Sequence, residues 1–102
     1  MVGGFWEGEG VATKTVPYSA RGAGELPNDK PVVYRIKTKG NQTNYVGVAQ
    51  RGRVQERIRE HIGNARIPGA KVHIEQKPSI REARATEKRV IARSKPRYNR
   101  QG

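Results

Sequence analysis

The chain has 102 residues, of which 33% are hydrophobic, so it can form one small domain with a small core. It contains no cysteine, which excludes a disulfide framework and a thiolate metal site. Its net charge of +12 predicts a polyanionic partner, most simply nucleic acid. A solubilising surface or an anionic-membrane binder is the alternative. Nucleic acid is favoured because no basic amphipathic helix with a bulky aromatic face is present.

Residues 1–29 differ in composition from the rest of the chain. They contain six glycines and two prolines without sustained periodicity, which predicts a flexible Gly-rich arm before one domain at residues 30–102. The arm has two basic and four acidic residues, net −2, so the other 73 residues carry +14. Its aromatic residues Phe5, Trp6 and Tyr18 could stack on nucleotide bases or pin the arm to the domain, and docking is favoured.

No targeting or membrane segment is predicted. The start, MVGGFWEGEG, lacks a basic region followed by an apolar run, and no stretch reaches membrane-spanning length. We therefore expect a cytoplasmic protein without a membrane partner.

Two strands are predicted after the arm. The sequence PVVYRIK at residues 31–37 alternates between two faces, and TNYVGVA at residues 43–49 follows a turn that contains glycine and asparagine. This pattern predicts an antiparallel hairpin. Gly47 has no side chain to pack, so it suits a place where another group comes close to the strand.

The next segment, RVQERIREHI at residues 53–62, is predicted to be a helix with Gly63 as its C-cap, because apolar residues recur every four positions. Arg57 and His61 are also four apart and border the apolar face, so they could point into a shared cleft. The alternatives are a solvated helix charge for Arg57 and a helix-end contact for His61.

A third strand is predicted at residues 70–76, AKVHIEQ, with His73 on its outer face. Ser79 and Glu82 then form a capping box that begins the last helix. Pro96 ends that helix, and an irregular basic tail follows.

The last helix places a carboxylate where a small core should not contain one. On a helical projection Ala83, Val90 and Ile91 form one apolar stripe, and Glu87 falls inside it. A carboxylate there must be neutralised, be paired with a cation, or line a cleft where a metal can bind. Arg84 lies one turn before Glu87 and could form the ion pair, so the helix alone leaves both interpretations open.

The order of these features resembles the GIY-YIG nuclease family. Two strands carry the triplets VVY and YVG with tyrosines eleven residues apart, and the next helix carries arginine and histidine four apart. A helical glutamate and an asparagine twelve residues later complete the pattern. The matching residues are Tyr34, Tyr45, Arg57, His61, Glu87 and Asn99.

The resemblance implies an α+β fold with a small three-stranded antiparallel sheet flanked by helices. It also implies cleavage of phosphodiester bonds with one divalent metal ion, Mg²⁺ or Mn²⁺, giving 5′-phosphate and 3′-hydroxyl ends. Glu87 would be the sole protein ligand of the metal, and Asn99 would hold the site together. One carboxylate is enough for Mg²⁺, which keeps most of its waters.

The other four residues would act on the phosphate and the attacking water. By resemblance, Tyr34 is the general base, Tyr45 positions water and phosphate, and Arg57 stabilises the charged phosphorane. His61 would lie near the scissile phosphate or the base. A phenol is a weak base at neutral pH because its pKa is about 10, so it needs nearby positive charge.

The chain departs from the family pattern in three ways. Val32 and Val33 replace glycine and isoleucine, Glu56 stands where some members have a basic residue, and the segment between His61 and Glu87 is short. The predicted function is a DNA endonuclease of low sequence specificity, with RNA, a homodimer and a targeting partner left open. A non-catalytic nucleic-acid-binding protein and an antibacterial toxin nuclease, which would be secreted, are the alternatives.

Overall fold

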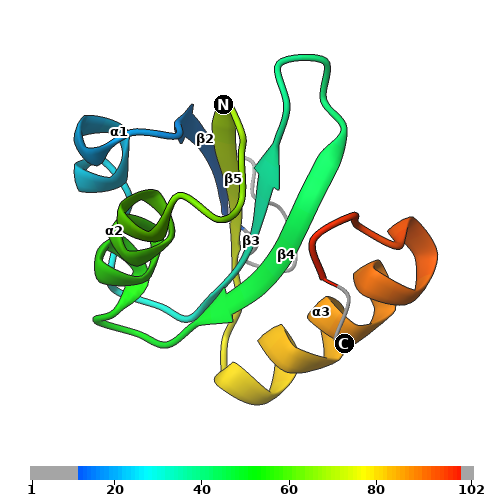
Figure 1. Ribbon diagram of the computed structural model, residues 1–102. Helices are drawn as coiled ribbons and strands as arrows, with labels where there is room; N and C mark the ends of the chain where they lie inside the picture. The colour runs from blue at the N-terminus through cyan, green and yellow to red at the C-terminus, as the bar shows by residue number, and fades with distance from the viewer. Residues whose placement is uncertain (1–11, 100–102) are drawn as a thin grey trace, which may run out of the picture.

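The computed structural model describes residues 12–99, which form an α+β fold around a four-stranded antiparallel sheet (Figure 1). The strand order is β2-β5-β3-β4, so β2 and β4 are the two edges. The strands are β2 (Thr13–Pro17), β3 (Val32–Lys37), β4 (Thr43–Ala49) and β5 (Lys71–Gln76). The helices are α1 (Ala20–Gly24), α2 (Val54–Asn64) and α3 (Ile80–Ser94). No helix in this range is long and apolar enough to cross a membrane.

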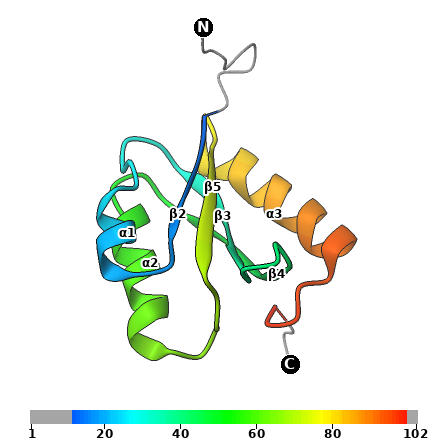
Figure 2. The same ribbon diagram turned by 90° about the horizontal axis from the view of Figure 1, so that it is seen from above.

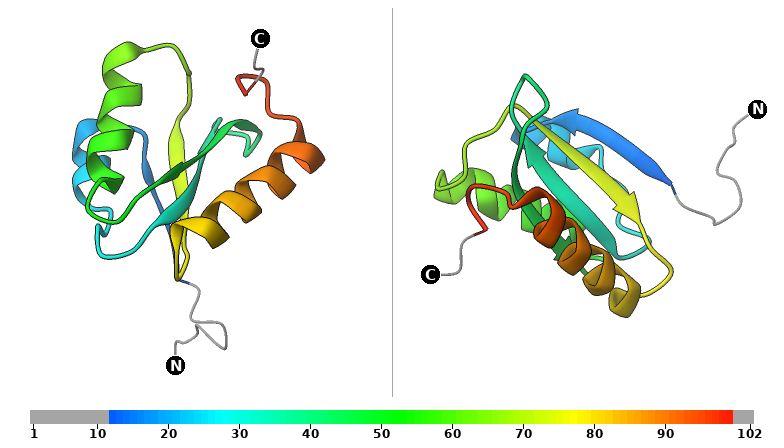
Figure 3. Two further views of the ribbon diagram at one scale, coloured as in Figure 1. Left: turned by 90° about the horizontal axis from the view of Figure 1, so that it is seen from below. Right: turned by 90° about the vertical axis from the view of Figure 1, so that its right-hand side faces the viewer.

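The helices cover both faces of the sheet (Figures 2 and 3). Alternation along β3 directs Tyr34 and Ile36 toward α1 and α2, where they join the larger apolar cluster. Val33 points to the other face and packs with Val46 against Ala83 and Val90 of α3. A sheet with two apolar faces therefore lies between two helical layers.

The predicted hairpin and third strand are confirmed. Strand β3 pairs antiparallel with β4 and with β5, and Val72 and Ile74 of β5 are buried as expected. The hairpin turn contains Asn41 at φ 73°, a left-handed conformation that asparagine tolerates. The capping role of Ser79 is also confirmed, because its side chain accepts a hydrogen bond from the backbone N–H of Glu82.

The N-terminal part of the chain differs from the prediction. Residues 13–24, expected to belong to a flexible arm, form the strand β2 and the short helix α1, so the sheet has four strands and not three. Val16 and Leu26 are buried in the main core, and all five residues of β2 pair with β5. The phenol of Tyr18 donates to the carbonyl of Ile67 at 2.9 Å, which confirms docking for this residue. Residues 1–11 of the predicted arm, with Phe5 and Trp6, lie outside the described residues, as do residues 100–102.

Helix α2 ends two residues later than predicted. It continues through Gly63 to Asn64, and Ala65 caps it in the left-handed conformation at φ 55°. The N–H of Ala65 donates to the carbonyl of His61, so the cap fixes the turn of helix that carries this histidine.

Candidate active site

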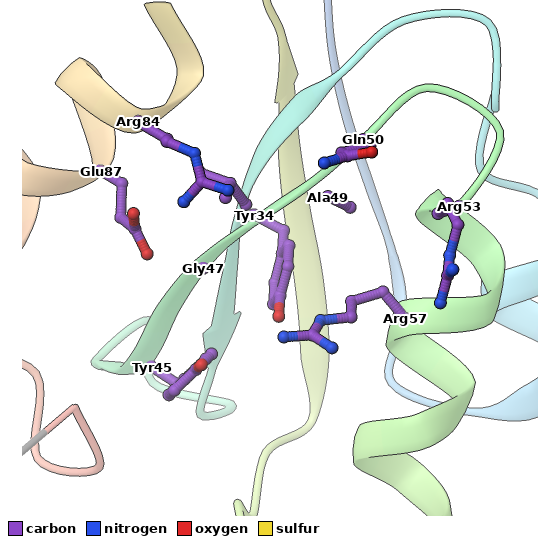
Figure 4. Close-up of a pocket in the computed structure, with 10 residues that line it drawn as sticks. Tyr34, Tyr45, Gly47, Ala49, Gln50, Arg53, Arg57, Arg84 and Glu87 are labelled. Atoms are coloured by element: carbon purple, nitrogen blue, oxygen red, sulfur yellow. The ribbon is translucent and has the colours of Figure 1, made fainter. Parts of the chain in front are cut away.

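A pocket of about 330 Å³ opens over the edge strand β4, between α2 and α3 (Figure 4). Four of the six residues singled out from the sequence line it: Tyr34 and Tyr45 from the hairpin, Arg57 from α2, and Glu87 from α3. Neither of the other two lines it: His61 contacts Tyr34 and Tyr45, and Asn99 bonds to Val46, which lies between two lining residues of β4. The remaining wall residues are Gly47, Val48, Ala49, Gln50, Arg53 and Arg84.

Tyr34 passes over β4 at Gly47. The two residues are cross-strand partners, and a Cβ atom at Gly47 would lie 2.6 Å from both Cζ and the hydroxyl oxygen of Tyr34. It would also lie 3.0 Å from Cε2 of Tyr45. Glycine therefore leaves the space through which the Tyr34 ring reaches the pocket, and this explains the missing side chain in a strand.

The hydroxyl of Tyr34 forms a short hydrogen bond with His61. The distance from the hydroxyl oxygen to Nε2 is 2.6 Å, and the two rings meet edge to face with centroids 5.5 Å apart. Burial and the nearby positive charge of Arg57 lower the pKa of His61, so its imidazole is neutral at neutral pH. A neutral ring protonated at Nδ1 accepts this bond at Nε2, and Tyr34 donates it.

Burial raises the pKa of Tyr34 well above its ordinary value, and Tyr45 adds to this shift. Tyr34 is 0% exposed, so its phenol is protonated and its hydroxyl is held against His61. The rings of Tyr45 and His61 are also close, with centroids 4.9 Å apart. The three rings form one cluster at the end of the pocket nearest α2.

Arg57 extends from α2 to the hydroxyl of Tyr34 (Figure 4). Coulombic interaction with Tyr34 is the main cause that raises the pKa of this arginine. Its other partner is Glu60, at 3.3 Å, and the side chain is 46% exposed. Arg57 is thus a cation that borders both the phenol and the solvent, as its place at the rim of the apolar helix face predicted.

Glu87 points into the pocket from α3 (Figure 4). Among residues 12–99, no lysine, arginine or histidine lies within ion-pair distance of its carboxylate. Burial raises the pKa of Glu87, and Arg84 opposes this shift only in part. The interpretation of Glu87 as half of a structural ion pair is therefore not supported, and the carboxylate faces an open cleft.

The donor set restricts which metal the pocket can hold. Within residues 12–99, no group of three or more histidine, aspartate or glutamate side chains comes together. A metal that requires a nearly complete set of protein ligands, such as structural zinc, therefore does not fit. One carboxylate in a polar cleft does fit Mg²⁺, which is held by one or two carboxylates together with waters and substrate phosphates.

Asn99 fixes the edge strand beside the pocket. Its Oδ1 accepts from the N–H of Val46 at 2.7 Å, and its Nδ2 donates to the carbonyl of the same residue at 2.9 Å. The N–H of Tyr98 donates to the carbonyl of Asn44 at 2.8 Å. The tail thus pairs with the outer edge of β4 at the residue between Tyr45 and Gly47.

Arg53 was not predicted as a pocket residue, and Arg84 was expected only as an ion-pair partner of Glu87. Arg53 lies four residues before Arg57, so the same helical spacing could have identified it. Gln50 also lines the pocket, but it belongs to the loop between β4 and α2 and has no spacing that marks it.

A comparison with known protein families, with curated proteins and with solved structures found no match. The GIY-YIG resemblance therefore remains a prediction that rests on the residues and their placement.

Proposed function

We propose that this protein is a metal-dependent endonuclease that hydrolyses phosphodiester bonds in DNA at the pocket over β4. The observation that supports this most is the convergence of Tyr34, Arg57 and Glu87 on one pocket, from three elements far apart in the sequence. His61 forms a hydrogen bond with Tyr34, and Asn99 forms one with the backbone of β4.

The charges of the pocket suit a phosphodiester. Arg53 and Arg57 come from one wall and Arg84 from the other, against the single carboxylate of Glu87. A phosphate between these walls would receive hydrogen bonds from guanidinium groups, which stabilise the negative charge of a phosphorane. The lining has no evident element for reading base edges, so low sequence specificity is expected.

The hydrogen bond from Tyr34 to His61 provides a path for the proton of the attacking water. A free phenolate is not available at neutral pH, because the pKa of Tyr34 is raised. The phenol would instead take a proton from water while it gives its own proton to Nε2 of His61. The water oxygen bonds to phosphorus, the bond from phosphorus to the 3′ oxygen breaks, and that oxygen takes a proton from solvent. His61 then gives up its extra proton to solvent, and Tyr34 remains protonated.

Arg57 would control access to this path. Tyr34 is fully buried, and the guanidinium of Arg57 lies beside its hydroxyl on the pocket side (Figure 4). A bound phosphate would attract Arg57 and draw the guanidinium away from the phenol. Water could then reach the hydroxyl at the moment the substrate is present.

Glu87 is the residue that would hold Mg²⁺. When bound, the ion supplies positive charge that stabilises the leaving 3′ oxygen. The raised pKa of Glu87 is consistent with this role, because a nearby cation would offset the cost of burying its charge.

The chemical ends of the nicked DNA test the proposed direction of bond cleavage. Plasmid nicked by the protein with Mg²⁺ should be resealed by a DNA ligase, which requires a 5′-phosphate next to a 3′-hydroxyl. Nicks that ligase cannot seal until a phosphatase and a kinase have exchanged the ends would contradict the proposed direction of bond cleavage.

One observation favours a second candidate, a non-catalytic protein that binds nucleic acid. The full burial of Tyr34 leaves its hydroxyl without direct access to solvent. On this alternative the tyrosine and histidine serve only to pack α2 against the hairpin. Binding of DNA without any Mg²⁺-dependent cleavage would support it.

A further inference from the structure

The side of the sheet that faces α3 is only half covered. Helix α3 packs on β4 and β3, whereas β5 and β2 extend clear of it (Figure 3, right). Alternation places Arg35 and Lys37 of β3 and Lys71 and His73 of β5 on this side, and their side chains are partly exposed. We name these four residues the open-face cluster.

The cluster brings like charges together across the strands. Lys37 and Lys71 are direct cross-strand partners, and Arg35 is paired in register with His73, whose pKa is lowered by burial and by Arg35, so that its ring is neutral at neutral pH. Like charges placed directly opposite destabilise a sheet. Burial lowers the pKa of Lys37, and the positive charges of Arg35 and Lys71 lower it further.

The nearby carboxylate does not neutralise the two lysines. Glu75 pairs with Lys77 at 2.9 Å and with Arg35 at 3.6 Å. Neither Lys37 nor Lys71 has a carboxylate within ion-pair distance in the part of the chain that the structure describes.

Helix α3 separates the open-face cluster from the candidate active site. The buried line of α3 runs through Ala83, Thr86 and Val90, and Glu87 lies on the flank toward the pocket over β4. Helix geometry places Arg89 and Arg93 on the other flank, toward β5. These two arginines add positive charge to the flank away from the pocket, which Glu82 shares at the start of the helix.

We propose that the open-face cluster, with Arg89 and Arg93, binds the phosphates of a second segment of nucleic acid. Of its six side chains only the imidazole of His73 is a ring on which a base could stack, so the surface would contact mainly phosphates, without regard to sequence. None of these six side chains is apolar, so none of them could insert into a lipid bilayer. The choice of nucleic acid as the polyanion rests on the proposed function.

A second bound segment would help a nuclease of this size to hold its substrate. The pocket contacts the scissile region on one side of α3, and phosphates held on the other side would keep the substrate in place. Duplex that bends around α3, or a branched molecule, could occupy both surfaces together.

DNA binding measured under conditions that prevent cleavage shows the contribution of this surface alone. Fluorescence anisotropy of a short labelled duplex, measured in EDTA over a range of salt concentrations, compares the parent with Lys37→Gln/Lys71→Gln. The matched control is Arg21→Gln/Lys30→Gln, which removes two exposed charges that have no ion pair among the described residues. Thermal unfolding should show that the first variant is at least as stable as the parent, since a repulsion is removed.

The open-face variant should bind more weakly, and the slope of log affinity against log salt should fall by about two, because each phosphate contact contributes about one. The control should keep the parent slope. Equal slopes for the two variants would overturn the proposal, as would weakened binding to anionic vesicles with unchanged DNA binding. A parent that binds in this way but never cleaves would refute the proposed function and leave this inference standing.

Discussion

The hydroxyl of Tyr34 on β3 lies 2.6 Å from Nε2 of His61 on α2, inside a cluster of three aromatic rings. Burial raises the pKa of the phenol and lowers that of the imidazole, so the proton rests on the tyrosine and the histidine is neutral. This pair therefore links the fold of the hairpin and α2 to the proposed chemistry.

Replacement of His61 should change both the rate and its dependence on pH. Burial holds the pKa of His61 below 6.5, so kcat/KM of the parent should fall as the pH drops through that lowered value. His61→Gln should lose about 100-fold or more in kcat/KM, since the proton from Tyr34 has no acceptor. The fall in kcat/KM at acid pH that remains in this variant should then follow the protonation of Glu87. An unchanged pH profile in a folded His61→Gln protein would rule out the relay.

Glu87→Gln should raise thermal stability while it abolishes cleavage. Burial raises the pKa of Glu87 above 4.5, so the folded protein holds this proton more tightly than the unfolded chain does. The stability associated with this carboxyl is thus lost as pH rises through the folded pKa. At neutral pH the variant should have a higher Tm than the parent, and the difference should vanish below pH 4.5.

Magnesium gives a second readout for the same variant. Since a ligand that binds only the folded state raises its stability, Mg²⁺ should raise the Tm of the parent and leave that of Glu87→Gln unchanged. Equal Mg²⁺ shifts in the two proteins would show that the ion binds elsewhere.

Gly47→Ala should disturb the position of Tyr34. The added methyl group would lie 2.6 Å from the phenol, and overpacking of this kind costs about 1–3 kcal/mol. We expect a lower Tm and strongly reduced cleavage. Gly63→Ala is the control, because a Cβ atom there has nothing within 4 Å and alanine favours the helix by about 0.5–1 kcal/mol. A Gly47→Ala protein with parental rate and Tm would contradict the packing described.

Asn99→Ala should weaken the site without removing any pocket residue. The change deletes both side-chain bonds to Val46, and the loss of such bonds costs about 1–3 kcal/mol. The edge of β4 should exchange its amide hydrogens faster, and kcat should fall more than KM rises. Asn64→Ala, at the exposed end of α2, should leave exchange in β4 unchanged. If β4 of the Asn99→Ala protein exchanged its amide hydrogens at the parental rate, the tail would not be what holds this strand.

The regular periodicities of the sequence predicted most of the elements correctly. The hairpin, β5 and α3 follow from alternation and from the cap at Ser79, which are local properties. Strand β2 could not be predicted in this way, because only Val16 of its five residues is buried and its pairing with β5 spans a long sequence separation. Helix α1 is a single short element whose glycines suggested an arm.

The candidate site was predictable in its residues but not in its contacts. Spacing placed Arg57 and His61 on one helix face, yet it gave no sign that the histidine would bond to Tyr34. The helical projection showed that Glu87 was out of place and left its partner undecided. The choice between Arg84 and an open cleft depends on how α3 lies against β4, which is a tertiary property.

Nicking of supercoiled plasmid with Mg²⁺ tests the proposed nuclease most directly. The parent should convert the plasmid to the open circle, whereas Arg57→Ala and Glu87→Ala should each be at least about 100-fold slower, the size of effect seen when one group that stabilises a transition state is removed. Arg59→Ala, an exposed arginine of the same helix outside the pocket lining, should cleave at nearly the parental rate. A parent that binds the plasmid and leaves it supercoiled would contradict the account, as would a Glu87→Ala protein that cleaves at the parental rate.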